Sequence, residues 1–223
     1  MLEIEIKSLL GDKEKADALR QRLKDMDPDL ELVSKHKQLN HYFIGDNFDG
    51  LFENISPLLK DRERLGLKKI IDEGKDLSVR TRQMEGRAFL VVKASIDDTT
   101  SANGILRTEF EEEIPGKTLE EVDQVLINSG FKYQSRWSRE REEYKMGKNS
   151  VTIDRNAGYG HVAEFERVVE DATKAEEIKM ELRELMERLG LEELPQDRLE
   201  RMFQYYNEHW PAYYGTDEIF VID

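Results

Sequence analysis

A strict alternation of polar and apolar residues at the start of the chain is the feature that most constrains its fold. Residues 1–7 read M-L-E-I-E-I-K. In an extended strand, successive side chains point to opposite faces, so Glu3, Glu5 and Lys7 share one face and the apolar residues share the other. Taken alone, this pattern is typical of an edge strand that exposes its charged face to water.

The same alternation returns along the rest of the chain, with helical patterns between the strands. Further strands are predicted over residues 31–44, 77–82, 87–94, 105–114, 131–144, 150–155 and 161–169. Helices are predicted over 13–26, 118–129, 172–189 and 196–210, the last ended by Pro211. Residues 51–59 and 65–71 could form short helices, and 218–222 could add a small strand.

Charged residues recur in pairs, two positions apart, on most of the predicted strands. The pairs are Glu3/Glu5, Arg80/Arg82, Glu109/Glu111, Arg139/Arg141 and Glu164/Glu166, with Lys7, Lys93, Arg107 and Asp154 in support. If helices cover the apolar faces, the charged faces must turn toward one another. A closed antiparallel barrel achieves this and leaves no sheet edge. We therefore predict an α+β fold: a closed eight-stranded antiparallel barrel over residues 1–170, with helices outside it. Residues 171–223 are expected to form a C-terminal helical tail packed on the barrel as part of one structural unit.

Composition limits the classes of partner. The 223 residues carry a formal net charge of −14, which disfavours nucleic acid and anionic membranes as general partners. There is no cysteine, so disulfides and thiolate metal sites are excluded. The four histidines are scattered, which disfavours a histidine-rich zinc site. With no apolar leader at the start and no apolar run of membrane-spanning length, we expect a soluble, cytoplasmic protein.

A barrel interior with charges of both signs indicates the kind of ligand. Burying so many charges costs several kcal/mol per ion unless each is paired or hydrated, so the interior should be a wet tunnel. Arginine and lysine suit a chain of phosphates. Carboxylates do not bind phosphate, but they bind Mg²⁺ or Mn²⁺, which bridge to phosphate oxygens. A polyphosphate with one or two metal ions satisfies the whole set.

At this point the sequence resembles a known family. E-I-E-I-K at residues 3–7 resembles the ExExK signature of the CYTH proteins, the triphosphate tunnel metalloenzymes. The later charged pairs resemble that family in kind and order over about residues 1–168. One departure is Asn40, which stands two residues before Tyr42-Phe43, where many cyclase-like relatives have aspartate. The resemblance implies an eight-stranded antiparallel tunnel and a divalent-metal enzyme acting on triphosphates.

The resemblance also implies roles for individual residues. Glu3, Glu5, Glu164 and Glu166 would be metal ligands, and Glu109, Glu111 and Asp154 would support or complete the metal sites. The phosphates would be held by Lys7, Arg80, Arg82, Lys93, Arg107, Arg139 and Arg141. Lys7 could also orient or deprotonate the nucleophile, with Tyr42 as a second candidate, although charge pairing is the preferred role for Lys7.

Three classes of function stay open on the sequence. The preferred one is a Mg²⁺- or Mn²⁺-dependent hydrolase of inorganic, nucleoside or thiamine triphosphate. The residues needed to bind the metal ion and the phosphates are all present, and the sequence indicates no nucleobase pocket. The second is an adenylyl cyclase of class IV type, which makes cyclic AMP from ATP. The third is a non-catalytic protein that binds polyphosphate or nucleotide. No nucleic acid or membrane partner is expected.

Several other residues have structural interpretations. Trp137 is expected in the core more than against a base. The aromatic residues of the tail are expected to pack its helix onto the barrel or onto a second subunit in a homodimer. Gly158-Tyr159-Gly160 is interpreted as a turn. Four further glutamates are interpreted as a solvated face, namely Glu112, Glu140, Glu142 and Glu143.

Overall fold

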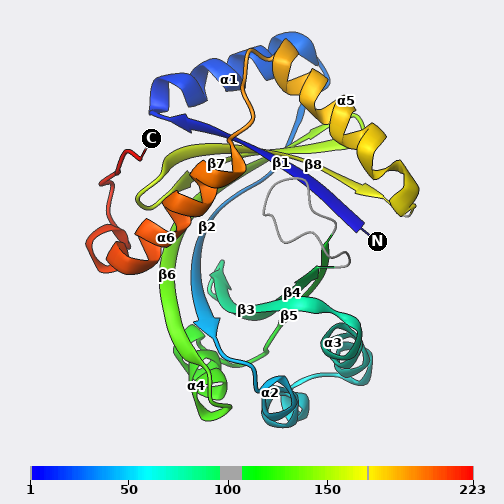
Figure 1. The fold of residues 1–223 in the computed structure, drawn as a ribbon, viewed down its shortest axis with the longest axis vertical. Helices are drawn as coiled ribbons and strands as arrows, with labels where there is room; N and C mark the ends of the chain where they lie inside the picture. The colour runs from blue at the N-terminus through cyan, green and yellow to red at the C-terminus, as the bar shows by residue number, and fades with distance from the viewer. Residues whose placement is uncertain (1, 96–106, 170, 223) are drawn as a thin grey trace. The chain divides into compact units, whose positions relative to one another are not determined.

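The computed structural model describes residues 2–95, 107–169 and 171–222, and in this part of the chain the fold is α+β. It contains eight β-strands and six α-helices (Figure 1). The chain divides into two compact units. The terminal unit comprises Met1–Lys37 and Ser138–Asp223, and the central unit comprises Gln38–Thr100 and Arg107–Trp137.

The elements follow the predicted order. The terminal unit contains β1 (Leu2–Gly11), α1 (Lys13–Met26), β7 (Asn149–Asn156), β8 (Gly160–Val169), α5 (Ala175–Arg188) and α6 (Gln196–Tyr213). The central unit contains α2 (Phe48–Ile55), α3 (Asp61–Glu73), β3 (Lys75–Met84), β4 (Arg87–Ser95), β5 (Arg107–Glu113) and α4 (Leu119–Asn128). Two long strands, β2 (Glu31–Ile44) and β6 (Lys132–Met146), contribute residues to both units, and short 3₁₀ turns lie at Ser56–Leu58 and Ala172–Lys174.

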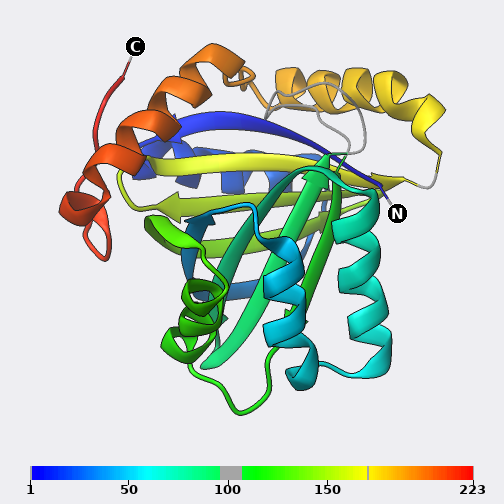
Figure 2. The ribbon, with the colours of Figure 1, turned by 60° about the horizontal axis from the view of Figure 1, so that its bottom comes forward.

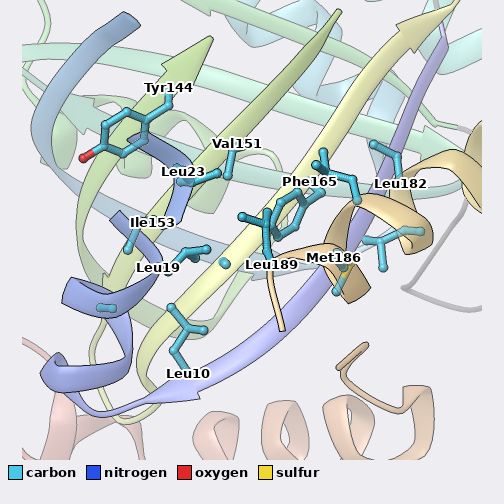
Figure 3. Packing of buried hydrophobic residues seen from close by; sticks show 14 of the residues in the cluster. Leu10, Leu19, Leu23, Tyr144, Val151, Ile153, Phe165, Leu182, Met186 and Leu189 are labelled. Carbon is cyan, nitrogen blue, oxygen red and sulfur yellow. The ribbon is translucent and has the colours of Figure 1, made fainter. Parts of the chain in front are cut away.

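The sheet of the terminal unit is antiparallel, in the order β6-β7-β8-β1. Its apolar face carries Ile4 and Ile6 from β1 and Phe165 from β8, all fully buried. The helices α1 and α5 both pack against β1 and β8 and cover this face (Figure 1). Figure 3 shows Leu19 of α1 among the side chains that close this core. The alternation read from residues 1–7 is therefore confirmed for the described side chains, with the apolar face turned to the helices.

Local signals account for the first helix of the terminal unit. The Asp12 side chain accepts a hydrogen bond from the backbone N–H of Lys15 at 2.8 Å, as expected of an N-cap residue. The buried residues of α1 are Ala16, Leu19 and Leu23, which lie on one face at helical spacing. The helix begins and ends where the sequence predicts.

The sheet of the central unit is also antiparallel, in the order β2-β3-β4-β5. The helices α3 and α4 pack against its strands, and α2 packs against both helices (Figure 2). Thr118 and Glu121 form the capping box predicted at the start of α4: the Glu121 N–H donates to the Thr118 hydroxyl, and the Thr118 N–H donates to the Glu121 carboxylate. The apolar core includes Leu90 and Val92 of β4, both fully buried.

Three sequence-based expectations were wrong in detail. Pro211 does not end the last helix, because α6 continues to Tyr213, where the N–H of Tyr214 still reaches the carbonyl of Trp210. Residues 218–222 form a single parallel bridge, Gly158 to Ile219, and no strand. Glu142 does not lie on a solvated face: its carboxylate accepts hydrogen bonds from Arg20, Lys35 and Tyr144.

The aromatic residues of the tail pack inside the terminal unit. Tyr206 of α6 is fully buried and meets the ring of Tyr159 edge-on at 6.1 Å between centroids. Tyr159 lies in the turn between β7 and β8, where Gly158 and Gly160 both have positive φ, as the G-Y-G interpretation requires. The tail helix therefore contacts the turn between β7 and β8. Within the described residues, no helix is long and apolar enough to cross a membrane.

Candidate metal and phosphate site

Three carboxylates come together on the charged face of the terminal sheet. Glu3 and Glu5 project from β1 and Glu166 from β8, where Glu5 is the direct cross-strand partner of Glu166. One oxygen from each lies within 4.8 Å of the others, and all three side chains are half-buried. Ligand oxygens lie about 2.1 Å from Mg²⁺ and about 2.4 Å from Ca²⁺, so oxygens on opposite sides of one ion are ~4–5 Å apart. This all-oxygen group fits a hard divalent cation with small side-chain movements.

A lysine completes this part of the face. Lys7 and Glu164 are direct partners across β1 and β8, and Lys7 Nζ donates to Glu164 Oε1 at 2.7 Å. The same ammonium group is paired with Glu5. Lys7 thus lies between one carboxylate of the three and the carboxylate of Glu164, and it can reach an anion that bridges a metal ion and the neighbouring arginines.

Two arginines of β6 converge on a buried aspartate. Asp154 of β7 is the direct partner of Arg141 and is 0% exposed. Arg141 donates to both Asp154 oxygens, from Nε at 2.8 Å and from Nη2 at 2.6 Å, and Arg139 Nη1 donates to Oδ2 at 3.1 Å. Arg141 Nη2 also donates to Glu164. The Asp154 carboxylate therefore accepts three hydrogen bonds from two guanidinium groups.

The electrostatics follow from these contacts. Burial alone would raise the pKa of Glu164, but the charges of Lys7 and Arg141 outweigh it and hold that pKa well below its usual range. Burial alone would likewise lower the pKa of Arg141, yet Glu164 and Asp154 raise it well above its ordinary value. At neutral pH the Glu164 carboxylate and the Arg141 guanidinium are therefore both ionised. Glu164 and Asp154, which the resemblance places in or beside the metal sites, contact Lys7 and arginine side chains in this structure.

The charged face of the central sheet has the same character. Arg80 of β3 lies opposite Tyr42 of β2, and its Nη1 donates to the tyrosine oxygen at 2.6 Å. Its Nη2 reaches Glu109 Oε1 at 3.4 Å, and Lys93 Nζ pairs with the other Glu109 oxygen at 2.8 Å. Burial alone would raise the pKa of Glu109, but Lys93 and Arg80 lower it. Arg80 Nε is buried without a hydrogen-bond partner, so the guanidinium retains one donor for a further acceptor.

A second arginine lies two residues further along the same strand. Arg82 Nη1 donates to Glu111 Oε1 at 2.6 Å, and its Nε donates to the side-chain oxygen of Asn40 at 2.9 Å. Asn40 is the direct cross-strand partner of Arg82. The departure from the family pattern at this position therefore has a physical role: a neutral amide orients Arg82 without neutralising its charge.

The two sheets account for the predicted site residues as follows. The terminal unit gathers Glu3, Glu5, Lys7, Arg139, Arg141, Asp154, Glu164 and Glu166 on one face of its sheet. The central unit gathers Tyr42, Arg80, Arg82, Lys93, Glu109 and Glu111 on one face of its own. The backbone of Arg107 pairs with Ser95, but its side chain lies outside the described residues. Trp137 is buried as expected, at 8% exposed, but its ring centroid lies 6.3 Å from that of Tyr42, a residue of the charged face.

Sequence reasoning missed two residues of the site. Asn40 differs from the residue common in cyclase-like relatives, and the sequence alone gives it no role, but the structure places it opposite Arg82, which it orients. Thr152 of β7, which lies opposite Glu164, was not singled out, and its hydroxyl reaches Glu164 Oε2 at 3.5 Å. The period-two pattern places Thr152 on the face of Asp154, so that pattern was the available signal.

Comparisons with solved structures agree with this architecture. A conserved hypothetical protein from Pyrococcus furiosus is 22% identical, with a TM-score of 0.60, over 85% of this chain and 91% of that one. A protein from Pyrococcus horikoshii is 20% identical, with a TM-score of 0.59, over 87% and 93%. A candidate adenylate cyclase from Vibrio parahaemolyticus is 16% identical, with a TM-score of 0.61, over 92% and 98%. At these identities the likeness concerns the fold.

The family assignment rests on a match between the sequence and a family model. No curated protein matches this chain. The model of the CYTH domain matches residues 72–198, which includes the basic residues of β3, β4 and β6 and the carboxylates of β5, β7 and β8. The matched span is more than half of the 223 residues and begins after the E-I-E-I-K segment. The chain therefore belongs to the CYTH domain family.

Proposed function

We propose that this protein is a divalent-metal-dependent enzyme of phosphoryl transfer that hydrolyses a small-molecule triphosphate within a closed tunnel of its eight strands. The observation that carries the proposal is the charged face of the terminal sheet. Three carboxylates with oxygens within 4.8 Å lie on the same face as Lys7 and two arginines. Membership of the CYTH family supports a triphosphate-related activity.

The carboxylates divide into two roles. Glu3, Glu5 and Glu166 would hold Mg²⁺ or Mn²⁺, since they form the group with suitable oxygen geometry. Asp154 and Glu164 would orient the basic residues that they already contact. The bound metal ion would supply charge neutralisation at the phosphate oxygens and activation of the nucleophile.

The basic residues would hold the phosphates by exchanging partners. Lys7, Arg80, Arg82, Lys93 and Arg141 each contact a carboxylate, so each is held in place before substrate arrives. A phosphate oxygen can replace a carboxylate oxygen at an arginine with the same forked geometry. Arg107 and Arg139 would join the same row. Basic residues at the phosphates would supply positive charge where the transition state of phosphoryl transfer develops negative charge.

Lys7 and Tyr42 are the candidates to act on the nucleophile. Lys7 contacts Glu5, one of the proposed ligands, so its ammonium group lies next to the expected position of the metal ion. The Tyr42 oxygen accepts a hydrogen bond from Arg80, which holds the hydroxyl beside one of the proposed phosphate-binding residues. Both residues would orient and bind, and Lys7 would mainly pair with negative charge.

Adenylyl cyclisation is the second candidate. The fold likeness to a candidate adenylate cyclase, with a TM-score of 0.61 over 98% of that chain, favours it. In that reaction the ribose 3′-hydroxyl would attack the α-phosphorus, whereas in hydrolysis water attacks the terminal phosphorus. Both reactions need the same charge-handling residues, so the products must decide between them.

One set of incubations tests the proposal. The protein is supplied with tripolyphosphate, ATP or thiamine triphosphate, each with Mg²⁺ or Mn²⁺. Phosphate release that stops with a chelator supports hydrolysis, and pyrophosphate with cyclic AMP supports the cyclase. Binding without turnover of any substrate would refute both and leave a binding protein.

A variant pair locates the metal site within this test. Glu166→Gln should lower turnover by at least about a hundredfold and weaken Mn²⁺ binding, because it removes one of the three ligands. Glu176→Gln is the matched control, since that glutamate is exposed on α5 with its carboxylate paired to Lys179. Full activity of Glu166→Gln would remove this residue from the metal site.

A further inference from the structure

A buried aspartate of helix α4 lies behind the charged face of the central sheet. Asp123 is 1% exposed, and the buried residues around it on the helix are Leu119, Val122 and Leu126. An apolar side chain would satisfy packing at this position without the cost of burying a carboxylate. The aspartate therefore calls for an explanation in terms of its hydrogen bonds.

Asp123 accepts hydrogen bonds from three different strands. The Thr81 hydroxyl of β3 donates to Oδ1. His41 Nδ1 of β2 lies 2.7 Å from Oδ2, and the Tyr133 hydroxyl of β6 donates to the same oxygen at 2.6 Å. Burial, together with the hydrogen bond to Asp123, raises the pKa of Tyr133 to about 12. The tyrosine therefore keeps its proton and remains a donor throughout the physiological pH range.

Two of the residues that contact Asp123 lie opposite each other on neighbouring strands. His41 and Thr81 are direct partners in the β2–β3 ladder. The pairs on either side of them are Asn40 with Arg82 and Tyr42 with Arg80, which project from the opposite face. Both of these pairs are joined by side-chain hydrogen bonds on the charged face, at 2.9 Å and 2.6 Å.

We propose that Asp123 is a positioning residue, which holds β2 and β3 in register from behind and so fixes Arg80, Arg82 and Tyr42 for phosphate binding. The expected effect on phosphate binding rests on the proposed function, whereas the register of β2 against β3 can be measured independently of it. Because side chains alternate with a period of two, a slip of β2 or β3 by one residue would turn either Tyr42 or the two arginines to the helix-covered face and break their pairing. After such a slip His41 and Thr81 would no longer lie opposite each other, and they could not both hydrogen-bond to Asp123. Apolar contacts are not directional, so on their own they would oppose the slip less.

Thr81 offers the sharpest test, because its donor can be removed with little change of shape. Thr81→Val replaces the hydroxyl with a methyl group, and Thr81→Ser retains the hydroxyl. We expect Thr81→Val to weaken tripolyphosphate binding by about tenfold, because it removes one hydrogen bond to a charged acceptor, whereas Thr81→Ser stays within about threefold of the parent. Binding is measured by calorimetry and by fluorescence of Trp137 in a Trp210→Phe background, since Trp137 lies beside Tyr42.

Two further measurements separate positioning from general destabilisation. Mn²⁺ affinity should stay unchanged in Thr81→Val, because the three candidate ligands lie on strands of the terminal unit. Backbone cross-strand NOEs between His41 and Thr81 should weaken or shift in Thr81→Val and persist in Thr81→Ser. Tyr133→Phe, which leaves Oδ2 one donor fewer, provides a milder variant if Thr81→Val fails to fold.

The outcomes are distinct. Unchanged NOEs together with unchanged tripolyphosphate affinity in Thr81→Val and Tyr133→Phe would overturn the inference. An equal loss of Mn²⁺ and tripolyphosphate affinity would overturn it as well, because that result describes a loss of fold. A parent protein that neither binds nor hydrolyses any triphosphate would refute the proposed function, and the NOE comparison would then still decide whether Asp123 sets the register.

Discussion

The substitution Asp154→Asn separates the two roles that a carboxylate can have in this site. The sequence resemblance makes Asp154 part of the metal site, whereas the structure shows it 0% exposed and bound to Arg139 and Arg141. If the aspartate orients these arginines, the variant should lose stability and phosphate affinity. If it is a ligand, the variant should lose metal affinity.

The magnitude follows from the contacts. Asp154 accepts three hydrogen bonds from two guanidinium groups, and asparagine can accept through only one side-chain oxygen and carries no charge. Removing one partner of a buried ion pair costs about 3–5 kcal/mol, because the remaining charge is left buried without compensation. Arg141 retains Glu164, so we expect the lower end, about 3 kcal/mol. For a chain of this size, that corresponds to a fall of roughly 6–12 °C in Tm.

The assay combines thermal unfolding with Mn²⁺ and tripolyphosphate binding by calorimetry. Asp197→Asn is the matched control, because Asp197 is 71% exposed and pairs with Arg201 on the surface of α6. Exposed pairs of this kind contribute ~0.2–1 kcal/mol, so the control should shift Tm by at most a few degrees. Asp154→Asn should bind Mn²⁺ within about threefold of the parent protein and bind tripolyphosphate at least about tenfold more weakly. A tenfold loss of Mn²⁺ affinity with an unchanged Tm would refute this reasoning and restore Asp154 as a ligand.

Three further predictions concern other parts of the molecule. Burial alone would raise the pKa of Glu142, but Lys35 and its other partners lower it to about 2, so its stabilising contribution is complete above the ordinary pKa of 4.5 and is lost as pH falls toward 2. The difference in unfolding free energy between the parent and Glu142→Gln, about 1–2 kcal/mol after allowance for solvent screening, should therefore disappear over that range; a difference independent of pH would contradict this. Gly160→Ala should destabilise by about 2–4 kcal/mol in chemical unfolding, because φ is +72° and the new Cβ would meet the backbone oxygen of Gly11; an unchanged midpoint would exclude the clash. Lys7→Met should lower turnover by about a hundredfold or more while the protein stays folded, and wild-type turnover would exclude Lys7 from the site.

Much of the local structure was predictable from the sequence, for identifiable reasons. The N-cap at Asp12 and the capping box of Thr118 and Glu121 set helix starts by short-range hydrogen bonds. The alternation at residues 1–7 assigned each described side chain of the strand to the correct face. Pro211 does not end α6, because a proline removes only its own backbone donor and the hydrogen bond from the Tyr214 N–H to the Trp210 carbonyl still forms beyond it.

The candidate site was predictable in membership but less so in pairing. The sequence put Glu3, Glu5, Glu164 and Glu166 among the candidate ligands, and the structure brings oxygens of Glu3, Glu5 and Glu166 together. The period-two pattern could not show that Asp154 is bound by two arginines, since it treats all carboxylates on one face alike.

The sequence by itself determined which side chains share a face, because the geometry of a single strand fixes that from residue to residue. Only the tertiary structure decided which charges meet, because pairs such as Lys7 with Glu164 are 157 residues apart and depend on register between strands. It also revealed Asp123, which is one more acidic residue in an amphipathic helix until the fold places it against three strands. Register is a property of how strands associate, and a one-residue change in it would reassign every contact while leaving the sequence pattern intact.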